Sequence, residues 1–209
     1  MSINYNSEDT MKTFYPIRVM LLILLLVPAL VFVSGCGREE EAPDRERTPE
    51  DSMIGKRGPG GGWIFYDKGD DKGGWRYMEA APRPLRYKAE WGCFGKSISG
   101  ARGTSVGTGK SNTEAIIKAC DEPDIAAKAA AAYRGGRKTD WFLPSRDELN
   151  LIYENLSSEG IGRFAGFYWS STQGLADVAW SQCLGGRRIG KQYYTRKHGL
   201  RRVHPVRRF

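Results

Sequence analysis

The sequence predicts an α+β fold, because strand-like segments precede a run of helices and further strand-like segments follow it. Segments 63–66 and 75–81 are short and rich in aromatic or alternating apolar residues, as is typical of strands. Apolar residues at helical spacing are confined to the stretch between positions 111 and 156. Segments 167–171, 178–184, 191–196 and 202–209 then have strand character again, and glycine-rich turns separate them.

The first two strands are predicted to form a hairpin with a long loop. Residues 63–66 are an apolar run that stops at the glycine- and aspartate-rich segment 67–74. In segment 75–81, Trp75, Tyr77 and Glu79 alternate with Arg76 and Met78, which suits a strand. Residues 82–110 contain proline and many glycines, and we expect a loop there.

Two helices are predicted next. Ser111 and Glu114 have the Ser-x-x-Glu spacing of a capping box, in which each side chain binds the other residue's backbone N–H. We therefore expect a helix whose buried face includes Ile116, Ile117 and Cys120. Asp124 is expected to cap an alanine-rich helix at 125–133, which the glycine pair at 135–136 should end.

A second capping box, Ser145 and Glu148, begins the clearest helix of the sequence. Its apolar residues fall at positions i, i+3, i+4 and i+7, so one stripe should face the core: Leu149, Ile152, Tyr153 and Leu156. The segment before this helix, residues 140–144, places Trp141 and Leu143 where they can fill the core.

Residues 1–35 have the pattern of a lipoprotein signal peptide. A basic beginning precedes an uncharged apolar run at 19–33, which is shorter than the roughly 20 residues needed to cross a bilayer. Ser34, Gly35 and Cys36 follow, so a small residue precedes a cysteine as in the lipobox of bacterial lipoproteins. We expect Cys36 to be lipidated and to hold the protein on membrane lipid.

The predicted organisation is a signal peptide at 1–35, a charged tether at 36–57 and one folded domain at 58–209. The tether is rich in charge and proline and lacks aromatic residues, so it cannot bury enough apolar surface to fold. Gly37, rather than aspartate, follows Cys36, which by resemblance to the lipoprotein sorting rule of Gram-negative bacteria favours the outer over the inner membrane. We expect an exported protein anchored to the cell envelope, and the sequence leaves open whether it starts at Met1 or Met11.

The predicted domain is strongly basic, with 25 basic and 15 acidic residues and a net charge of +10. Residues 186–209 contain no acidic residue, and arginine forks can hold sulfate, phosphate or carboxylate through two hydrogen bonds. The expected polyanion-binding residues are Arg187, Arg188, Lys191, Arg196, Lys197, Arg201 and Arg202. The other interpretation, a solvated basic face with some arginines paired to acids, stays open, and Arg207 is expected to point inward and serve the fold.

Three cysteines remain once Cys36 is lipidated, which allows one disulfide outside the cytoplasm. The preferred pair is Cys93 with Cys120, while Cys183 lies in a strand pattern and is expected to be buried and free. No metal or cofactor is expected, because the chain has only two histidines and no zinc-ligand cluster. A calcium ion in the aspartate-rich loop at 67–71 is left open.

Six motifs together resemble the Lcl C-terminal domain family, a bacterial domain family named for a collagen-like adhesin. They lie at residues 60–67 (GGGWIFYD), 74–82 (GWRYMEAAP), 106–113 (VGTGKSNT), 140–149 (DWFLPSRDEL), 168–171 (YWSS) and 203–209 (VHPVRRF). The resemblance covers nearly all of 58–209 and implies a C-type-lectin-like fold of antiparallel sheets with two or three flanking helices. It also implies binding of sulfated glycosaminoglycans, as in the adhesin. His204 departs from the family, which commonly has arginine at this position.

The predicted function is a lipid-anchored binding module without catalytic residues, whose ligand is a sulfated or phosphorylated glycan or a matrix component. The carboxylates of segment 140–148 are interpreted as structural, and the serines of 170–171 have no histidine near them in sequence. Nucleic acid is not expected as a partner of an exported protein. Two alternatives stay open: an envelope structural or assembly protein that binds another protein, and an enzyme on a fold like that of the formylglycine-generating enzymes. The oligomeric state is not predicted.

Overall fold

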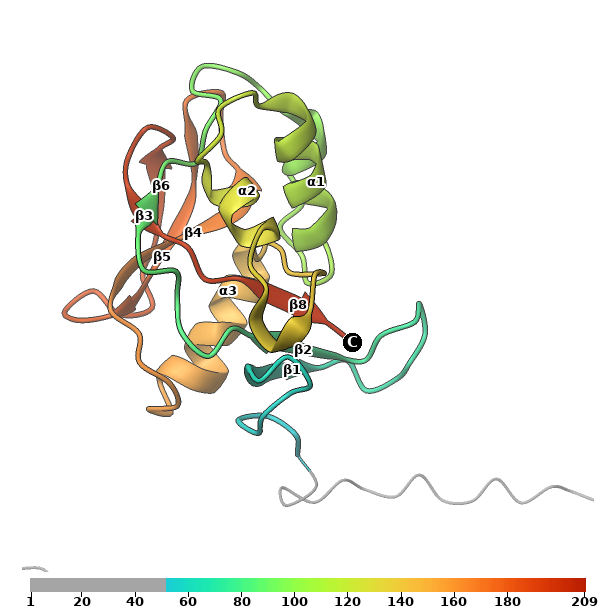
Figure 1. Cartoon of the computed structure of the whole chain (residues 1–209). Coiled ribbons are helices and arrows are strands. Elements are labelled where there is room, and N and C mark those ends of the chain that lie inside the picture. The colour runs from blue at the N-terminus through green and yellow to red at the C-terminus, as the bar shows by residue number, and fades with distance from the viewer. Residues whose placement is uncertain (1–51) are drawn as a thin grey trace, which may run out of the picture. The chain divides into compact units, whose positions relative to one another are not determined.

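A computed structural model describes residues 52–209 of the chain (Figure 1). The predicted signal peptide, the predicted lipidation site Cys36 and most of the predicted tether lie outside these residues. The described part has mixed helices and mostly antiparallel strands, so the α+β prediction is confirmed. No helix within residues 52–209 is long and apolar enough to cross a membrane.

The strands form two sheets. The three-stranded sheet has the order β1-β2-β8 and the five-stranded sheet the order β3-β7-β4-β5-β6. Their bounds are β1 Trp63–Asp67, β2 Tyr77–Ala80, β3 Lys88–Ala89, β4 Gly166–Gln173, β5 Val178–Gly185, β6 Gln192–Arg196, β7 Arg201–Arg202 and β8 Val206–Arg208. The predicted hairpin is confirmed, since β1 pairs antiparallel with β2, and all other pairings are antiparallel except β4 with β7.

The C-terminal segment, predicted as one strand, is divided between the two sheets. β7 pairs with β3 and β4, and β8 pairs with β2. Between them, Pro205 has no N–H to donate to a ladder, and His204 is turned into the core with 2% of its surface exposed. The last residues of the chain therefore join the two sheets, as the red segment of Figure 1 shows.

The helices are α1 Gly109–Ala119, α2 Ala126–Ala131 and α3 Arg146–Ile152, with 3-10 turns η2 Ser99–Ala101 and η3 Gly135–Arg137 and a π-helical turn η4 Tyr153–Ser157. Figure 1 shows α1 and α2 beside the five-stranded sheet and α3 between that sheet and the three-stranded one. Leu149, Ile152 and Leu156 of the predicted stripe are buried, and Tyr153 is half-buried.

The capping predictions are correct for α3 and wrong for α1. At α3, Ser145 Oγ accepts from Glu148 N–H, and the Glu148 carboxylate accepts from Ser145 N–H at 2.8 Å. Helix α1 begins at Gly109, two residues before Ser111, and Ser111 Oγ donates instead to the Thr108 carbonyl. Glu148 also binds this helix end, because its Oε1 accepts from Gly107 and Gly109 N–H at 2.8 and 3.2 Å. One buried carboxylate thus caps two helices.

Helix α2 is shorter than predicted and has no side-chain cap; its N-cap residue is Ile125, not Asp124. The helix ends at Ala131, before the predicted end at Tyr133. The loop predicted at 82–110 contains the short strand β3 and the turn η2, because Ala89 lies opposite Arg201. β3 has no local sequence signal, since it depends on a distant partner, whereas η2 is closed by the local bond from Ala101 N–H to Ile98 O.

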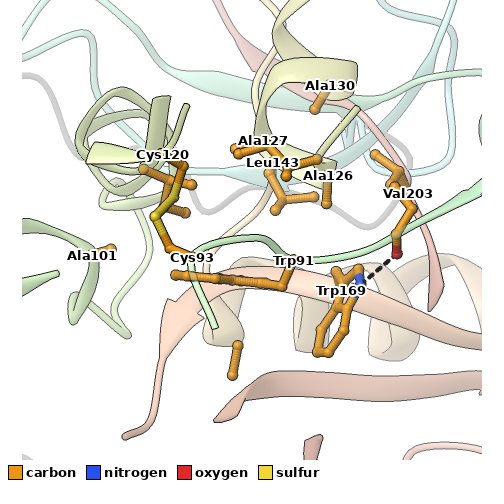
Figure 2. Close-up of a cluster of buried hydrophobic side chains, with 14 of the residues drawn as sticks. Trp91, Cys93, Ala101, Cys120, Ala126, Ala127, Ala130, Leu143, Trp169 and Val203 are labelled. Atoms are coloured by element: carbon orange, nitrogen blue, oxygen red, sulfur yellow. Dashed lines mark hydrogen bonds between the residues drawn. A yellow bond between two sulfur atoms is a disulfide. The ribbon is translucent and has the colours of Figure 1, made fainter. Parts of the chain in front are cut away.

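Two tryptophans lie at the centre of the larger core cluster (Figure 2). Trp91 and Trp169 are fully buried, and each indole N–H donates to a backbone carbonyl at 2.9 Å, Trp91 to Ser170 and Trp169 to Ala89. The Cys93–Cys120 disulfide lies at the edge of this cluster, and Cys183 is free and buried, so both cysteine predictions are confirmed.

An ion network joins the turn at Gly58–Gly62 to the last strand, β8. Its guanidinium and the Glu79 carboxylate are buried, and the Asp140 carboxylate is partly exposed. Arg207 donates to Glu79 at 2.7 Å and forms two bonds to Asp140, of 2.8 and 2.9 Å. Glu79 is fully buried and also accepts from Gly60 and Gly62 N–H at 2.8 and 2.9 Å. The prediction that Arg207 points inward is confirmed.

The Gly58–Gly62 turn is glycine-rich because the chain passes directly over this carboxylate. A Cβ at Gly60 would lie 2.7 Å from the Glu79 carboxylate, and one at Gly62 would lie 2.1 Å from the Ala80 carbonyl oxygen. Residues just before the turn are also ordered against the sheet: Gly55 N–H donates to Ile64 O, and Ile64 N–H donates to Lys56 O. The structured region therefore begins before the boundary predicted at residue 58.

We predict that Arg207→Met lowers the free energy of unfolding by about 3–5 kcal/mol, because it leaves the Glu79 carboxylate buried without a cation. Urea unfolding followed by circular dichroism measures the change. Arg208→Ser is the matched control on the same strand; Arg208 is half-buried and forms no ion pair with another residue of 52–209, so its loss should cost less than about 1 kcal/mol. Equal losses for the two variants would contradict a special role for the network.

Candidate functional site

Three neighbouring depressions on the described part of the chain are lined by cations and by no acidic residue. We call the largest, of about 520 Å³, the arginine groove; its lining includes Arg57, Trp63, Pro82, Arg83, Pro84, Leu85, Arg86, Arg163 and Arg202. The second, of about 210 Å³, shares Arg202 with it and adds Lys88 and Arg201. The third, of about 460 Å³, shares Arg201 and Phe167 with the second and adds Arg188 and Arg196. Together they form one basic surface centred on β7.

Four of the seven predicted polyanion-binding residues line this surface: Arg188, Arg196, Arg201 and Arg202. Arg187 and Lys191 are exposed near the turn between β5 and β6 but line none of the three depressions. Lys197 is not on the surface at all.

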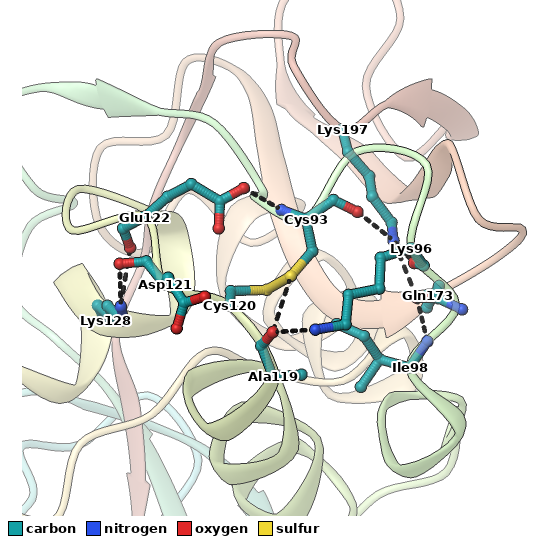
Figure 3. The surroundings of a disulfide bond; sticks show 10 residues. All are labelled: Cys93, Lys96, Ile98, Ala119, Cys120, Asp121, Glu122, Lys128, Gln173 and Lys197. Atoms are coloured by element: carbon teal, nitrogen blue, oxygen red, sulfur yellow. Dashed lines mark hydrogen bonds between the residues drawn. A yellow bond between two sulfur atoms is a disulfide. The ribbon is translucent and has the colours of Figure 1, made fainter.

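Burial of Lys197 corrects the prediction for this residue (Figure 3). Its ammonium lies 4.5 Å from the centre of the Trp91 ring. It donates to Lys96 O at 2.7 Å, Gln173 Oε1 at 2.9 Å and Cys93 O at 3.3 Å, so all three N–H groups are used. Burial lowers the pKa of Lys197 to about 8, against the opposing charges of Asp177 and Glu122. Lys197 therefore holds the loop that follows Cys93 and is not available to a ligand.

Five cations of the surface were not predicted as binding residues: Arg57, Arg83, Arg86, Lys88 and Arg163. They come from the predicted tether, from the loop at 82–110 and from the segment before β4, so no stretch of sequence gathers them. The only local signal is that segment 83–88 contains three cations; Pro82 precedes this segment and Pro84 lies within it.

The cations of the basic surface have no acidic partner within residues 52–209, because the ion pairs of that region involve other residues. Two of the arginines are positioned by aromatic rings instead. The Arg57 guanidinium lies 3.4 Å above the Trp63 ring centre, and that of Arg201 lies 5.5 Å from Phe167. Phe167 in turn packs edge-on against Tyr193 at 5.6 Å, so the lining of the third depression includes a pair of packed aromatic rings.

The carboxylates of the aspartate-rich loop at 67–71 do not come together as a cluster of three potential metal ligands. Asp67 accepts from Arg76 at 2.9 Å, and Asp70 lies 3.1 Å from the Lys68 ammonium. Within the described residues, three potential metal ligands come together only at Cys93, Cys120 and Glu122, and there the two sulfur atoms are bonded to each other. The calcium site left open above gains no support from this geometry.

Several chemically interesting groups outside the basic surface serve the fold. Ser171 Oγ donates to Pro144 O and Ser170 Oγ to Trp180 O, so both serines are occupied by backbone carbonyls. Burial raises the pKa of Glu148 to about 7, against three backbone N–H groups that favour the ionised form. These residues cap and join elements rather than face a cleft.

His204 is a buried neutral histidine. Its Nε2 lies 2.8 Å from the Ala81 carbonyl, which assigns the proton to Nε2, and its Nδ1 has no hydrogen-bond partner. Phe164 and Tyr168 pack against the ring at 5.2 and 5.9 Å. Burial lowers the pKa of His204 to about 4, although the hydrogen bond to Ala81 opposes the shift.

Neither the comparison with protein-family models nor that with curated proteins found a match for this chain. The geometry of the basic surface is therefore the main guide to function.

We predict that Lys197→Met destabilises the fold by about 2 kcal/mol or more, because it removes all three hydrogen bonds of a buried ammonium. Gln173 Oε1 and the Cys93 carbonyl keep Ile98 N–H and Lys96 N–H as donors, whereas the Lys96 carbonyl loses its donor. Its retention on a heparin column should be unchanged, because the ammonium never reaches the surface. Lys191→Met, at an exposed lysine, is the control and should leave the free energy of unfolding unchanged. A folded Lys197→Met protein with weaker heparin retention would contradict this assignment.

We predict that His204 makes the fold less stable in acid. The unfolded chain binds a proton at His204 near pH 6.5 and the folded chain only near pH 4, so stability is lost as the pH falls through this window. His204→Gln does not titrate, so the free energy of unfolding of the native protein minus that of the variant should fall by about 3 kcal/mol between pH 7 and pH 4. Urea unfolding at several pH values measures this difference. A constant difference would show that His204 titrates alike in both states.

Proposed function

We propose that this protein is a lipid-anchored binding module of the bacterial cell envelope that recognises a polyanionic glycan or matrix component. The observation that carries the proposal is the basic surface: three adjoining depressions lined by nine cations, none of which has an acidic partner among residues 52–209. Charge left uncompensated in a concave surface concentrates anions there. A polymer with repeated negative groups could contact all three depressions at once.

The shape of the third depression adds to the argument for a glycan. Phe167 and Tyr193 present aromatic surface beside Arg188, Arg196 and Arg201. Apolar surface with a few well-placed polar groups is the usual composition of a ligand site. A charged sugar matches it, because its ring offers C–H groups and its substituents offer oxyanions.

The resemblance to the Lcl C-terminal domain family is part of this proposal, as is the C-type-lectin-like fold that it implies. Two observations support it. Glu79, Asp140 and Arg207, which form the ion network, lie in three of the six motifs. The C-terminal strand β8 also pairs with the hairpin that begins the domain, which brings the two ends of the domain together.

Export and lipidation at Cys36 complete the proposal. The Cys93–Cys120 disulfide supports export, because disulfides persist in oxidising compartments. A lipid on Cys36 would place the basic surface at the envelope, on a tether of about 20 residues that reaches a few nanometres at most.

A role as an envelope protein that binds another protein is the second candidate. It is favoured by exposed apolar side chains on two adjoining loops, Phe94 (51% exposed) and Leu175 (66% exposed), which the bond from Gly95 N–H to Ala176 O holds together. If this role is the main one, Phe94→Ser with Leu175→Ser should remove the partners recovered by pull-down, whereas substitution of the cations should not.

We predict that Arg188→Ser, Lys191→Ser and Arg196→Ser together weaken heparin binding about tenfold, since each exposed charge pair is worth about 0.2–1 kcal/mol. All three side chains are exposed on or beside β6. The measurement is the dissociation constant on immobilised heparin, with the salt concentration of column elution as a second readout. Arg102→Ser, Lys118→Ser and Arg134→Ser form the charge-matched control on other exposed positions and should keep native affinity. If both triple variants lose heparin affinity equally, heparin binding depends on the net charge of the protein and not on these positions.

A further inference from the structure

We propose that the arginine groove is a distinct site for a sugar that carries a phosphate monoester. The inference deepens the proposed function, on which it rests for the class of ligand, by naming the group that is recognised. It concerns Arg57, Arg83, Arg86, Arg163 and Arg202, of which only Arg202 belongs to the basic cluster that is visible in the sequence.

The groove concentrates positive charge beyond what a single sulfate would neutralise. Its five arginines have no acidic partner within residues 52–209. A phosphate monoester carries about −1.5 to −2 at neutral pH and offers three strong acceptor oxygens. A sulfate ester carries a single negative charge, so phosphate compensates the cluster better. The lining cations are arginines without exception, and a guanidinium can give two parallel hydrogen bonds to a tetrahedral oxyanion.

The arginines are attached to parts of the chain that the fold holds in place. The Arg57 guanidinium lies over the Trp63 ring and donates to Gly61 O at 2.8 Å, which leaves most of its N–H groups free for a ligand. Arg83 and Arg86 flank Leu85, whose N–H donates to Val203 O at 2.9 Å. Arg202 lies in β7, paired with Lys88 of β3 and with Tyr168 of β4. A site attached to three regions of the fold needs little reorganisation to bind.

The size and the walls of the groove favour a sugar over inorganic phosphate alone. A volume of about 520 Å³ is far larger than one phosphate and lies in the usual range for small-molecule sites. Pro82, Pro84 and Leu85 supply apolar wall between the arginines. A phosphorylated monosaccharide would place its ring against this wall and its phosphate among the guanidinium groups.

The test is a ³¹P NMR titration of glucose 6-phosphate with the full-length chain in detergent. We expect saturable binding that is weaker by at least about tenfold for Arg83→Lys with Arg86→Lys, because lysine keeps the charge but loses the two-pronged geometry. Both side chains are exposed, and lysine preserves the charge of the loop, so the variant should fold. Arg102→Lys with Arg134→Lys is the matched control and should bind like the native protein. Inorganic phosphate should bind more weakly than glucose 6-phosphate.

Three results would overturn the proposal. They are no saturable binding of glucose 6-phosphate, equal binding by the native protein and the Arg83→Lys, Arg86→Lys variant, and equal affinity for inorganic phosphate. Phosphatidylcholine vesicles doped with phosphatidic acid separate the sources of phosphate: binding to vesicles that depends on Arg83 and Arg86, without binding of the sugar, would reassign the groove to a lipid headgroup.

The heparin measurement with the triple variant of residues 188, 191 and 196 is independent of this titration. Those positions lie outside the arginine groove, and the Arg83→Lys, Arg86→Lys variant keeps its net charge. Native heparin binding combined with no sugar phosphate binding would reject the groove alone. If the native protein does not bind heparin at all, the proposed recognition of a polyanionic glycan is rejected.

Discussion

The arrangement of this domain depends on one buried guanidinium. Arg207 connects Glu79 in the middle strand of the three-stranded sheet with Asp140 in the segment that precedes α3. Partial burial would raise the pKa of Asp140, but the hydrogen bonds and charge of Arg207 hold it below its ordinary value. A buried ion pair of this kind adds little stability compared with a well-packed apolar set, yet it penalises any arrangement that separates its members. It therefore specifies which strand lies beside which loop.

The same principle recurs at two other buried polar side chains. Glu148 joins the ends of α1 and α3, since its carboxylate accepts N–H groups from both. Lys197 joins the end of β6 to the loop after Cys93, and it does so through three acceptors with no carboxylate in direct contact. Each of these groups loses several hydrogen bonds if its partners move, so the core has few alternative packings.

The sequence motifs and the cations of the basic surface are different residues with different roles. The residues of the six sequence motifs contribute to the scaffold: glycines make room for Glu79, acids hold Arg207, and a serine and a glutamate cap α3. The nine cations of the basic surface all lie outside these motifs, in loops and on β3, β6 and β7. Loops on a rigid scaffold are where proteins usually place recognition residues. The motif residues of this chain thus serve its fold, and the cations of the basic surface come from outside the motifs.

The sequence by itself determined the features that depend on neighbours a few residues apart. The α+β class, the first hairpin, the stripe of α3 and its capping box all follow from short-range spacing and are present. The preference for Cys93 with Cys120 and a buried Cys183 also held. The basic character of the C-terminal region was visible too, and four of its seven predicted residues line the basic surface.

Tertiary structure decided whatever depends on distant partners. Ser111 lost its predicted role to Glu148, which lies 37 positions later in the chain and reaches the same helix end. The predicted final strand is divided because its two ends pair with strands of different sheets. Lys197 is buried because its acceptors come from distant parts of the chain, which no local pattern reveals. The arginine groove could not be predicted from the sequence, because it too depends on residues that are distant in the chain. Its cations come from separate segments, and a charge gives no sign in sequence of which other charges will surround it once the chain is folded.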